Sequence, residues 1–148
     1  AGELIPPNSN LIFEFKILDV LSPNYEKIDS EKLENLINEN AVALDIRLDN
    51  QWKKTGVIKG SFQETAFDIN GKFNVYLMDK VRALAGAESQ GIELIFISHD
   101  GKTAEILGNA FAEDLGFTNV FVLRVWIKAL IEEKKILIFE DIIILLWN

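Results

Sequence analysis

The residues best equipped for chemistry form one short run, residues 98–103, directly after an apolar stretch. Ser98, His99 and Asp100 offer a hydroxyl, an imidazole and a carboxylate, the groups that a serine hydrolase combines. Catalytic triads are assembled from distant parts of a chain, however, and three consecutive residues rarely converge on one reacting atom. The Gly-x-Ser-x-Gly sequence of a nucleophile elbow is also missing. The pattern therefore favours a polar loop in water, with an enzyme that uses Ser98, His99 or Lys102 as the alternative.

A second set of polar residues, Asp45 and Arg47, ends another short apolar stretch. The two charges could form a functional pair at a strand end, but a hydrogen-bonded ion pair that anchors the neighbouring loop is the simpler interpretation. The chain has no cysteine, and His99 is its only histidine. Thiolate and multi-histidine metal sites within one chain are therefore excluded, and we expect no metal and no cofactor.

The elements that must position these residues follow from the apolar patterning. Strands are predicted at residues 11–18, 41–46, 92–97 and 120–123, a further short extended piece at 57–62, and helices at 29–38, 49–54, 75–85, 102–115 and 126–134. Asp29 is expected to cap the first helix, and Asn40 to end it in a left-handed conformation. Short strands that alternate with helices indicate an α/β domain with a mainly parallel sheet. Ligands bind at the carboxyl ends of such strands, which is where the loop at Ser98 lies.

Length and charge narrow the function classes further. With 148 residues, 49% of them apolar, the chain suits a single domain over residues 1–148 with a core at about 28–133. The net charge of −8 argues against nucleic acid and against anionic membrane surfaces. No apolar run reaches the roughly 18 residues that cross a bilayer. The apolar tail at residues 136–147 is expected to pack within the chain, against the sheet or residues 11–17, with a homodimer surface as the alternative.

Four segments, in order and spacing, resemble the rhodanese family of sulfurtransferases. Residues 43–47 with Trp52 resemble its Asp-Val-Arg stretch and the Glu-aromatic pair that follows, with Gln51 in place of Glu. Residues 56–61 resemble its His-Ile-x-Gly-Ala turn, residues 95–104 its active-site loop, and residues 115–123 its Leu-Gly-Phe-x-x-Val-x-x-Leu sequence. The resemblance is greatest to small single-domain bacterial rhodaneses, many of them exported. It implies an α/β fold with helices on both faces of a central, mainly parallel sheet, and slightly favours export over a cytoplasmic location.

The departures from the family concentrate on the active-site loop. Ser98 stands where the family has the cysteine that carries sulfur as a persulfide, and serine cannot carry a persulfide. Thr103 and Ala104 replace the Arg and the Ser or Thr of the family pattern. Asp100 adds a negative charge to a loop meant to receive an anion, and Lys102 offsets it only in part. The loop that includes Gly101 is therefore interpreted as vestigial.

A further departure follows the last strand. Val125 and Trp126 replace the Gly-Gly of the family, and Trp126 could fill the old pocket or pack the last helix onto the sheet. Asp45 and Arg47 are expected to support the pocket. We therefore expect a catalytically inactive rhodanese-like domain that acts as a binding or regulatory module for a protein partner or a small anionic ligand. The alternatives are a hydrolase or transferase of altered chemistry, and an inactivated or engineered form of a thiosulfate sulfurtransferase.

Overall fold

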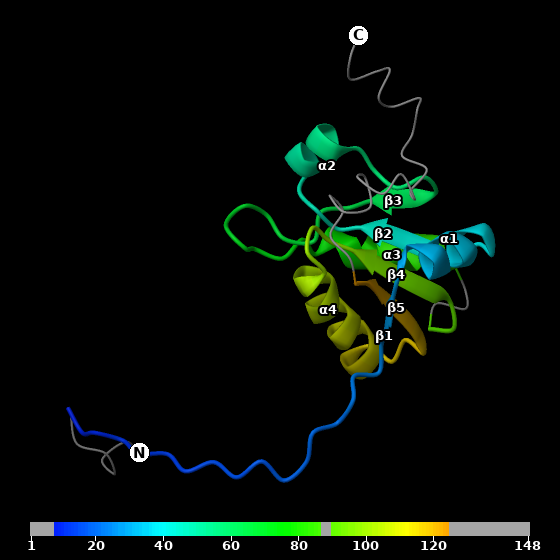
Figure 1. Ribbon diagram of the computed structural model, residues 1–148. Helices are drawn as coiled ribbons and strands as arrows, with labels where there is room; N and C mark the ends of the chain where they lie inside the picture. Colours follow the sequence, from blue (N-terminus) through cyan, green and yellow to red (C-terminus); the bar gives the residue numbers. More distant parts are fainter. Residues whose placement is uncertain (1–7, 87–89, 125–148) are drawn as a thin grey trace.

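One parallel sheet forms the centre of the protein (Figure 1). The computed structural model describes residues 8–86 and 90–124. Every neighbouring pair of strands is parallel, and the order across the sheet is β1-β5-β4-β2-β3. The strands are β1 (Glu26–Ile28), β2 (Val42–Asp45), β3 (Ser61–Gln63), β4 (Glu93–Ile97) and β5 (Asn119–Leu123). The structure thus confirms the predicted α/β class and its parallel sheet.

Helices cover both faces of the sheet. Alternate residues of a strand therefore pack against different helices. Ile95 and Ile97 of β4 belong to a cluster that includes Leu33 of α1 (Ser30–Asn38). Leu94 and Phe96 of the same strand point to the other face. There they join a larger cluster with side chains of α3 (Tyr76–Ala85), α4 (Lys102–Asn109) and the π-helical turn η2 (Ala110–Asp114). The other α-helix in the described part of the chain, α2 (Asp49–Thr55), buries none of its residues.

Local signals in the sequence explain where several of these elements begin and end. Asp29 is the N-cap of α1, and its carboxylate accepts a hydrogen bond of 2.9 Å from the Lys32 backbone N–H. Asn40 follows that helix with a φ of 71°, as predicted for a left-handed stop. The helix predicted over residues 102–115 is α-helical only to Asn109 and then widens into η2.

The strand predicted at residues 11–18 is wrong. Residues 9–23 form no regular element, and Figure 1 shows this segment as an extended trace leading away from the sheet. An apolar pattern reports what a strand would bury, whereas a strand forms only where a partner takes up its backbone hydrogen bonds. The edge strand β1 shows the converse, since its sequence Glu-Lys-Ile has no apolar alternation but pairs with β5.

Some predictions concern residues that the structure does not describe. The helix expected at residues 126–134, the tail at 136–147, and Val125 with Trp126 lie outside the described residues. Among the helices that are described, none is long and apolar enough to cross a membrane.

Candidate functional site

The loop of residues 98–101 joins the carboxyl end of β4, in the middle of the sheet, to α4, which begins at Lys102. Ser98 is only 3% exposed, and its side chain turns back toward the start of α4. There the Ser98 Oγ accepts a hydrogen bond of 3.2 Å from the Ala104 backbone N–H. The hydroxyl thus acts as an acceptor for one of the N–H groups at the beginning of the helix, which have no partner within it.

Asp100 occupies a second N–H group of the same turn. Its Oδ1 accepts a hydrogen bond of 3.0 Å from the Lys102 backbone N–H, and its Oδ2 lies 4.0 Å from the Lys102 Nζ. The Lys102 side chain is 84% exposed, so this ion pair contributes little and is screened by salt. The carboxylate is therefore held at the helix start chiefly by the backbone, and the loop carries a fixed negative charge there.

Gly101 is required by the path of this loop. Its φ is +83°, and a Cβ atom at this position would lie 3.2 Å from the Leu123 carbonyl oxygen at the end of β5. The loop therefore rests directly on the neighbouring strand. His99 is exposed, and Thr103 is half-buried. The structure thus brings the polar atoms of Ser98 and Asp100 to the same helix start.

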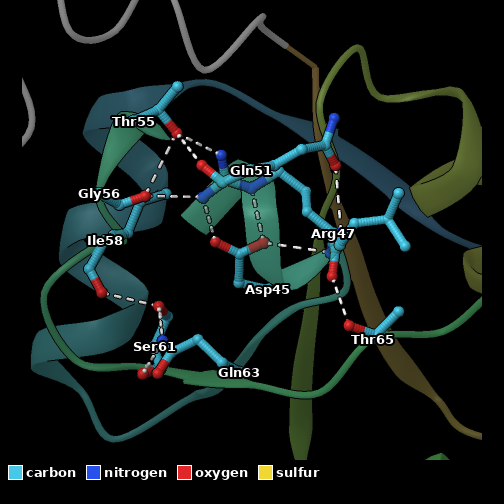
Figure 2. Close-up of polar contacts among 10 residues, drawn as sticks. Asp45, Arg47, Gln51, Thr55, Gly56, Ile58, Ser61, Gln63 and Thr65 are labelled. Atoms are coloured by element: carbon cyan, nitrogen blue, oxygen red, sulfur yellow. Dashed lines mark hydrogen bonds and ion pairs between the residues drawn. The ribbon is translucent and has the colours of Figure 1, made fainter. Parts of the chain in front are cut away.

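The predicted ion pair of Asp45 and Arg47 is present at the end of β2, the neighbour of β4 (Figure 2). Both residues are buried, and the guanidinium grips the carboxylate with two hydrogen bonds, Nε to Oδ1 at 2.8 Å and NH2 to Oδ2 at 2.6 Å. The same guanidinium donates to the Thr55 Oγ1 at 2.7 Å and the Gly56 carbonyl oxygen at 2.9 Å. Arg47 therefore ties the end of β2 to the end of α2.

Three residues that the sequence reasoning did not single out for this role complete the anchor (Figure 2). The Thr65 hydroxyl donates to the Arg47 carbonyl oxygen at 2.8 Å, and the Thr55 hydroxyl donates to the Gln51 carbonyl oxygen at 2.9 Å. The Gln51 Oε1 accepts a hydrogen bond of 3.1 Å from the Leu48 backbone N–H, which caps the start of α2. The spacing of Leu48 and Gln51 was the signal available for this cap.

The two parts of the site lie at one edge of the sheet without sharing a described side-chain hydrogen bond. The Ile46 backbone N–H donates to the Ile97 carbonyl oxygen at 2.9 Å. The residues that follow β2 therefore lie beside those that follow β4. The structure therefore gives Asp45 and Arg47 an anchoring geometry, and their support of a pocket stays a prediction. Within the described ranges, no group of three or more His, Cys, Asp or Glu side chains is placed to hold a metal ion.

Comparison with curated protein sequences gives no match. Among solved structures, the chain is similar to a protein of unknown function from Rhodopseudomonas palustris CGA009, described as a possible tyrosine phosphatase. The TM-score is 0.55 at 17% identity, over 78% of this chain and 85% of that one. It is also similar to reduced CoADR-RHD of Bacillus anthracis, with a TM-score of 0.53 at 12% identity, over 78% of this chain and 18% of the other. At such identities the likeness shows the fold alone.

The family is shown by the sequence itself. The model of the Rhodanese-like domain matches residues 29–138, which begin directly after β1 and continue beyond β5, and so include β2, β3, β4 and β5. With this match over most of its length, and with the parallel sheet and loop described above, the chain belongs to the rhodanese-like domain family.

Proposed function

We propose that this protein is a rhodanese-like domain without sulfurtransferase activity that acts as a binding or regulatory module. The observation that carries the proposal is the identity and setting of Ser98, the residue at the position of the family's sulfur-carrying cysteine. A thiolate can take a sulfane sulfur and hold it, whereas a serine hydroxyl is a weak nucleophile without an adjacent base. In the hydrogen bond described for the Ser98 Oγ, the oxygen accepts from a backbone N–H, an arrangement that does nothing to remove its proton.

The engaged N–H groups of the loop are the second support. Backbone N–H groups at a helix start stabilise an incoming anion when they are free to point at it. Here the Ala104 N–H is directed at the Ser98 Oγ and the Lys102 N–H at the Asp100 carboxylate. An anion such as thiosulfate would have to displace the carboxylate and would meet its negative charge. This arrangement favours a protein partner with neutral or basic groups over a small anion.

The supply of positive charge points the same way. Arg47 is a buried cation at the end of the neighbouring strand β2, and its guanidinium already donates hydrogen bonds to Asp45, Thr55 and Gly56. Lys102 projects into water beside Asp100. Neither side chain is therefore arranged as a fixed cation for a bound anion. A buried apolar cluster packs against each face of the sheet, so the scaffold of the family is retained.

The first experiment measures thiocyanate formation from thiosulfate and cyanide. We expect the unmodified chain and the matched variant Ser98→Ala to give the rate of the reaction without protein. Sulfur transfer by the unmodified chain above the Ser98→Ala rate would contradict the proposal, because only the hydroxyl distinguishes the two proteins. Thermal unfolding of each variant establishes that it is folded.

A second comparison isolates the loop from the missing nucleophile. Ser98→Cys restores a thiol, and Ser98→Cys with Asp100→Gly also frees the Lys102 N–H and removes the carboxylate. We expect the double variant to transfer sulfur at least tenfold faster than Ser98→Cys alone. Asp100→Asn in the Ser98→Cys background keeps an acceptor oxygen without the charge, and therefore separates the two effects. Equal rates for all three variants would show that Asp100 does not hinder sulfur transfer. That result would not bear on the expected inactivity of the unmodified chain.

A further inference from the structure

The most unusual surface of the described chain is the segment of residues 11–21, which we call the N-terminal apolar segment. Eight of its residues are large, apolar and 54–92% exposed: Leu11, Ile12, Phe13, Phe15, Ile17, Leu18, Val20 and Leu21. Single exposed apolar residues are common on proteins, but a contiguous run of this kind marks a surface that something covers. The two core clusters contain none of these residues, so the described domain closes its core without them.

Among the described residues, the segment makes few contacts. The interactions described for it are a hydrogen bond of 2.8 Å from the Val20 N–H to the Asp19 carboxylate and the stacking of Phe13 on Phe15 at 6.2 Å. Both join near neighbours in the chain. In an extended segment, residues 11, 13, 15 and 17 share one side, and here that side is wholly apolar. Within the described part of the chain, the segment therefore offers one uncovered apolar side.

We propose that the C-terminal residues 136–147 of the same chain pack against this apolar side. Ten of these twelve residues are apolar, and they too need cover from water. The two apolar stretches largely flank the part that matches the family, residues 29–138. Lys16, the only cation of the N-terminal apolar segment, leaves from the opposite side, but its long side chain can reach around the segment to Glu140 or Asp141.

The connection is long enough for this contact. The end of β5 at Leu123 pairs with the end of β1 at Ile28, and the N-terminal apolar segment enters at the opposite end of β1. The tail must therefore travel back along one strand length, about 16 Å for five residues. Residues 124–135 cover about 18 Å even when helical. Because the two segments belong to one chain, their effective concentration is in the millimolar range, which favours the contact over pairing with a second copy.

The absence of cysteine makes the test direct, because one substitution introduces the only thiol. Ile17→Cys places it in the N-terminal apolar segment, and Ile69→Cys is the matched control, since the two side chains are 80% and 79% exposed. We measure the rate of modification by an aromatic disulfide reagent in the full chain. We expect Ile17→Cys to react at least tenfold more slowly than Ile69→Cys, at a rate independent of protein concentration. Ile143→Asp with Leu145→Asp in the tail should abolish the difference.

Three outcomes would overturn the proposal: equal rates for the two thiols, protection that grows with protein concentration and so reports a second copy, and protection that survives the tail substitutions. If the tail variant does not fold, carbodiimide coupling of the unsubstituted chain decides. An amide bond between the Lys16 Nζ and the side-chain carboxyl group of Glu140 or Asp141 in the monomer supports the contact, and its absence rejects the contact. Neither measurement depends on sulfurtransferase activity, so this inference stands or falls separately from the proposed function.

Discussion

Arg47→Met tests how much the anchor at the end of β2 contributes to stability. The change removes the two hydrogen bonds to Asp45 and those to Thr55 and Gly56, and leaves the Asp45 carboxylate fully buried without its counter-charge. Removing one partner of a buried ion pair costs about 3–5 kcal/mol in the free energy of unfolding. With a denaturant slope of about 2 kcal/mol per M, the urea midpoint should fall by about 2 M.

The assay is urea unfolding followed by circular dichroism, with Lys53→Met as the matched control. Lys53 pairs with Asp49 at 2.7 Å on the exposed side of α2, and such a pair contributes about 0.3–0.5 kcal/mol. Asp45→Leu combined with Arg47→Met should recover part of the loss, since no charge then stays buried alone. A loss below about 1 kcal/mol for Arg47→Met would refute this reasoning, because it would mean that water reaches the carboxylate.

Two further predictions concern the loop and the edge strand. Gly101→Ala should lower the free energy of unfolding by about 1–2 kcal/mol more than an ordinary surface substitution, because its φ is positive and the Leu123 carbonyl oxygen is close. The control is Gly71→Ala, since Gly71 has a similar φ with open space around it. Equal urea midpoints for the two variants would reject the contribution of the contact. Burial, with the Glu105 charge, raises the pKa of Tyr25, and a hydrogen bond to Glu105 raises the pKa of Lys27. The stability linked to each raised pKa is present below the pKa of the unfolded chain, near 10, and is lost as pH rises through the pKa of the folded protein. The urea midpoint should therefore fall above about pH 10, and Glu105→Gln should flatten that fall; an unchanged slope in Glu105→Gln would contradict it.

Features written in a few neighbouring residues were predictable from the sequence. The cap at Asp29 and the left-handed stop at Asn40 depend on side chains or backbone angles within a few residues. The ion pair of Asp45 with Arg47 is equally local, since two positions separate its partners. For the same reason the position of Ser98 at the end of a buried strand followed from the apolar pattern before it.

Features that depend on distant parts of the chain were not predictable. The edge strand β1 exists because β5 lies beside it, and its own residues give no sign of that pairing. The π-helical turn η2 is a further example, because packing there overrides the regular α-helix that the local pattern predicts. The hydrogen bonds of Ser98 and Asp100 to the backbone at the start of α4 are local, but they were not predicted either, because the apolar pattern does not fix the direction of a polar side chain.

The pairing of β1 with β5 can form only late during synthesis of the chain. The register partners Glu26 and Phe121 are separated by almost the whole domain. At a ribosomal rate of about 5–20 residues per second, β5 follows β1 by roughly 5–20 seconds. During that interval the first strand has been made and its neighbour in the sheet has not. The nascent chain must therefore wait with this edge unpaired, and the apolar residues ahead of β1 make it a natural substrate for chaperones that hold unfolded segments.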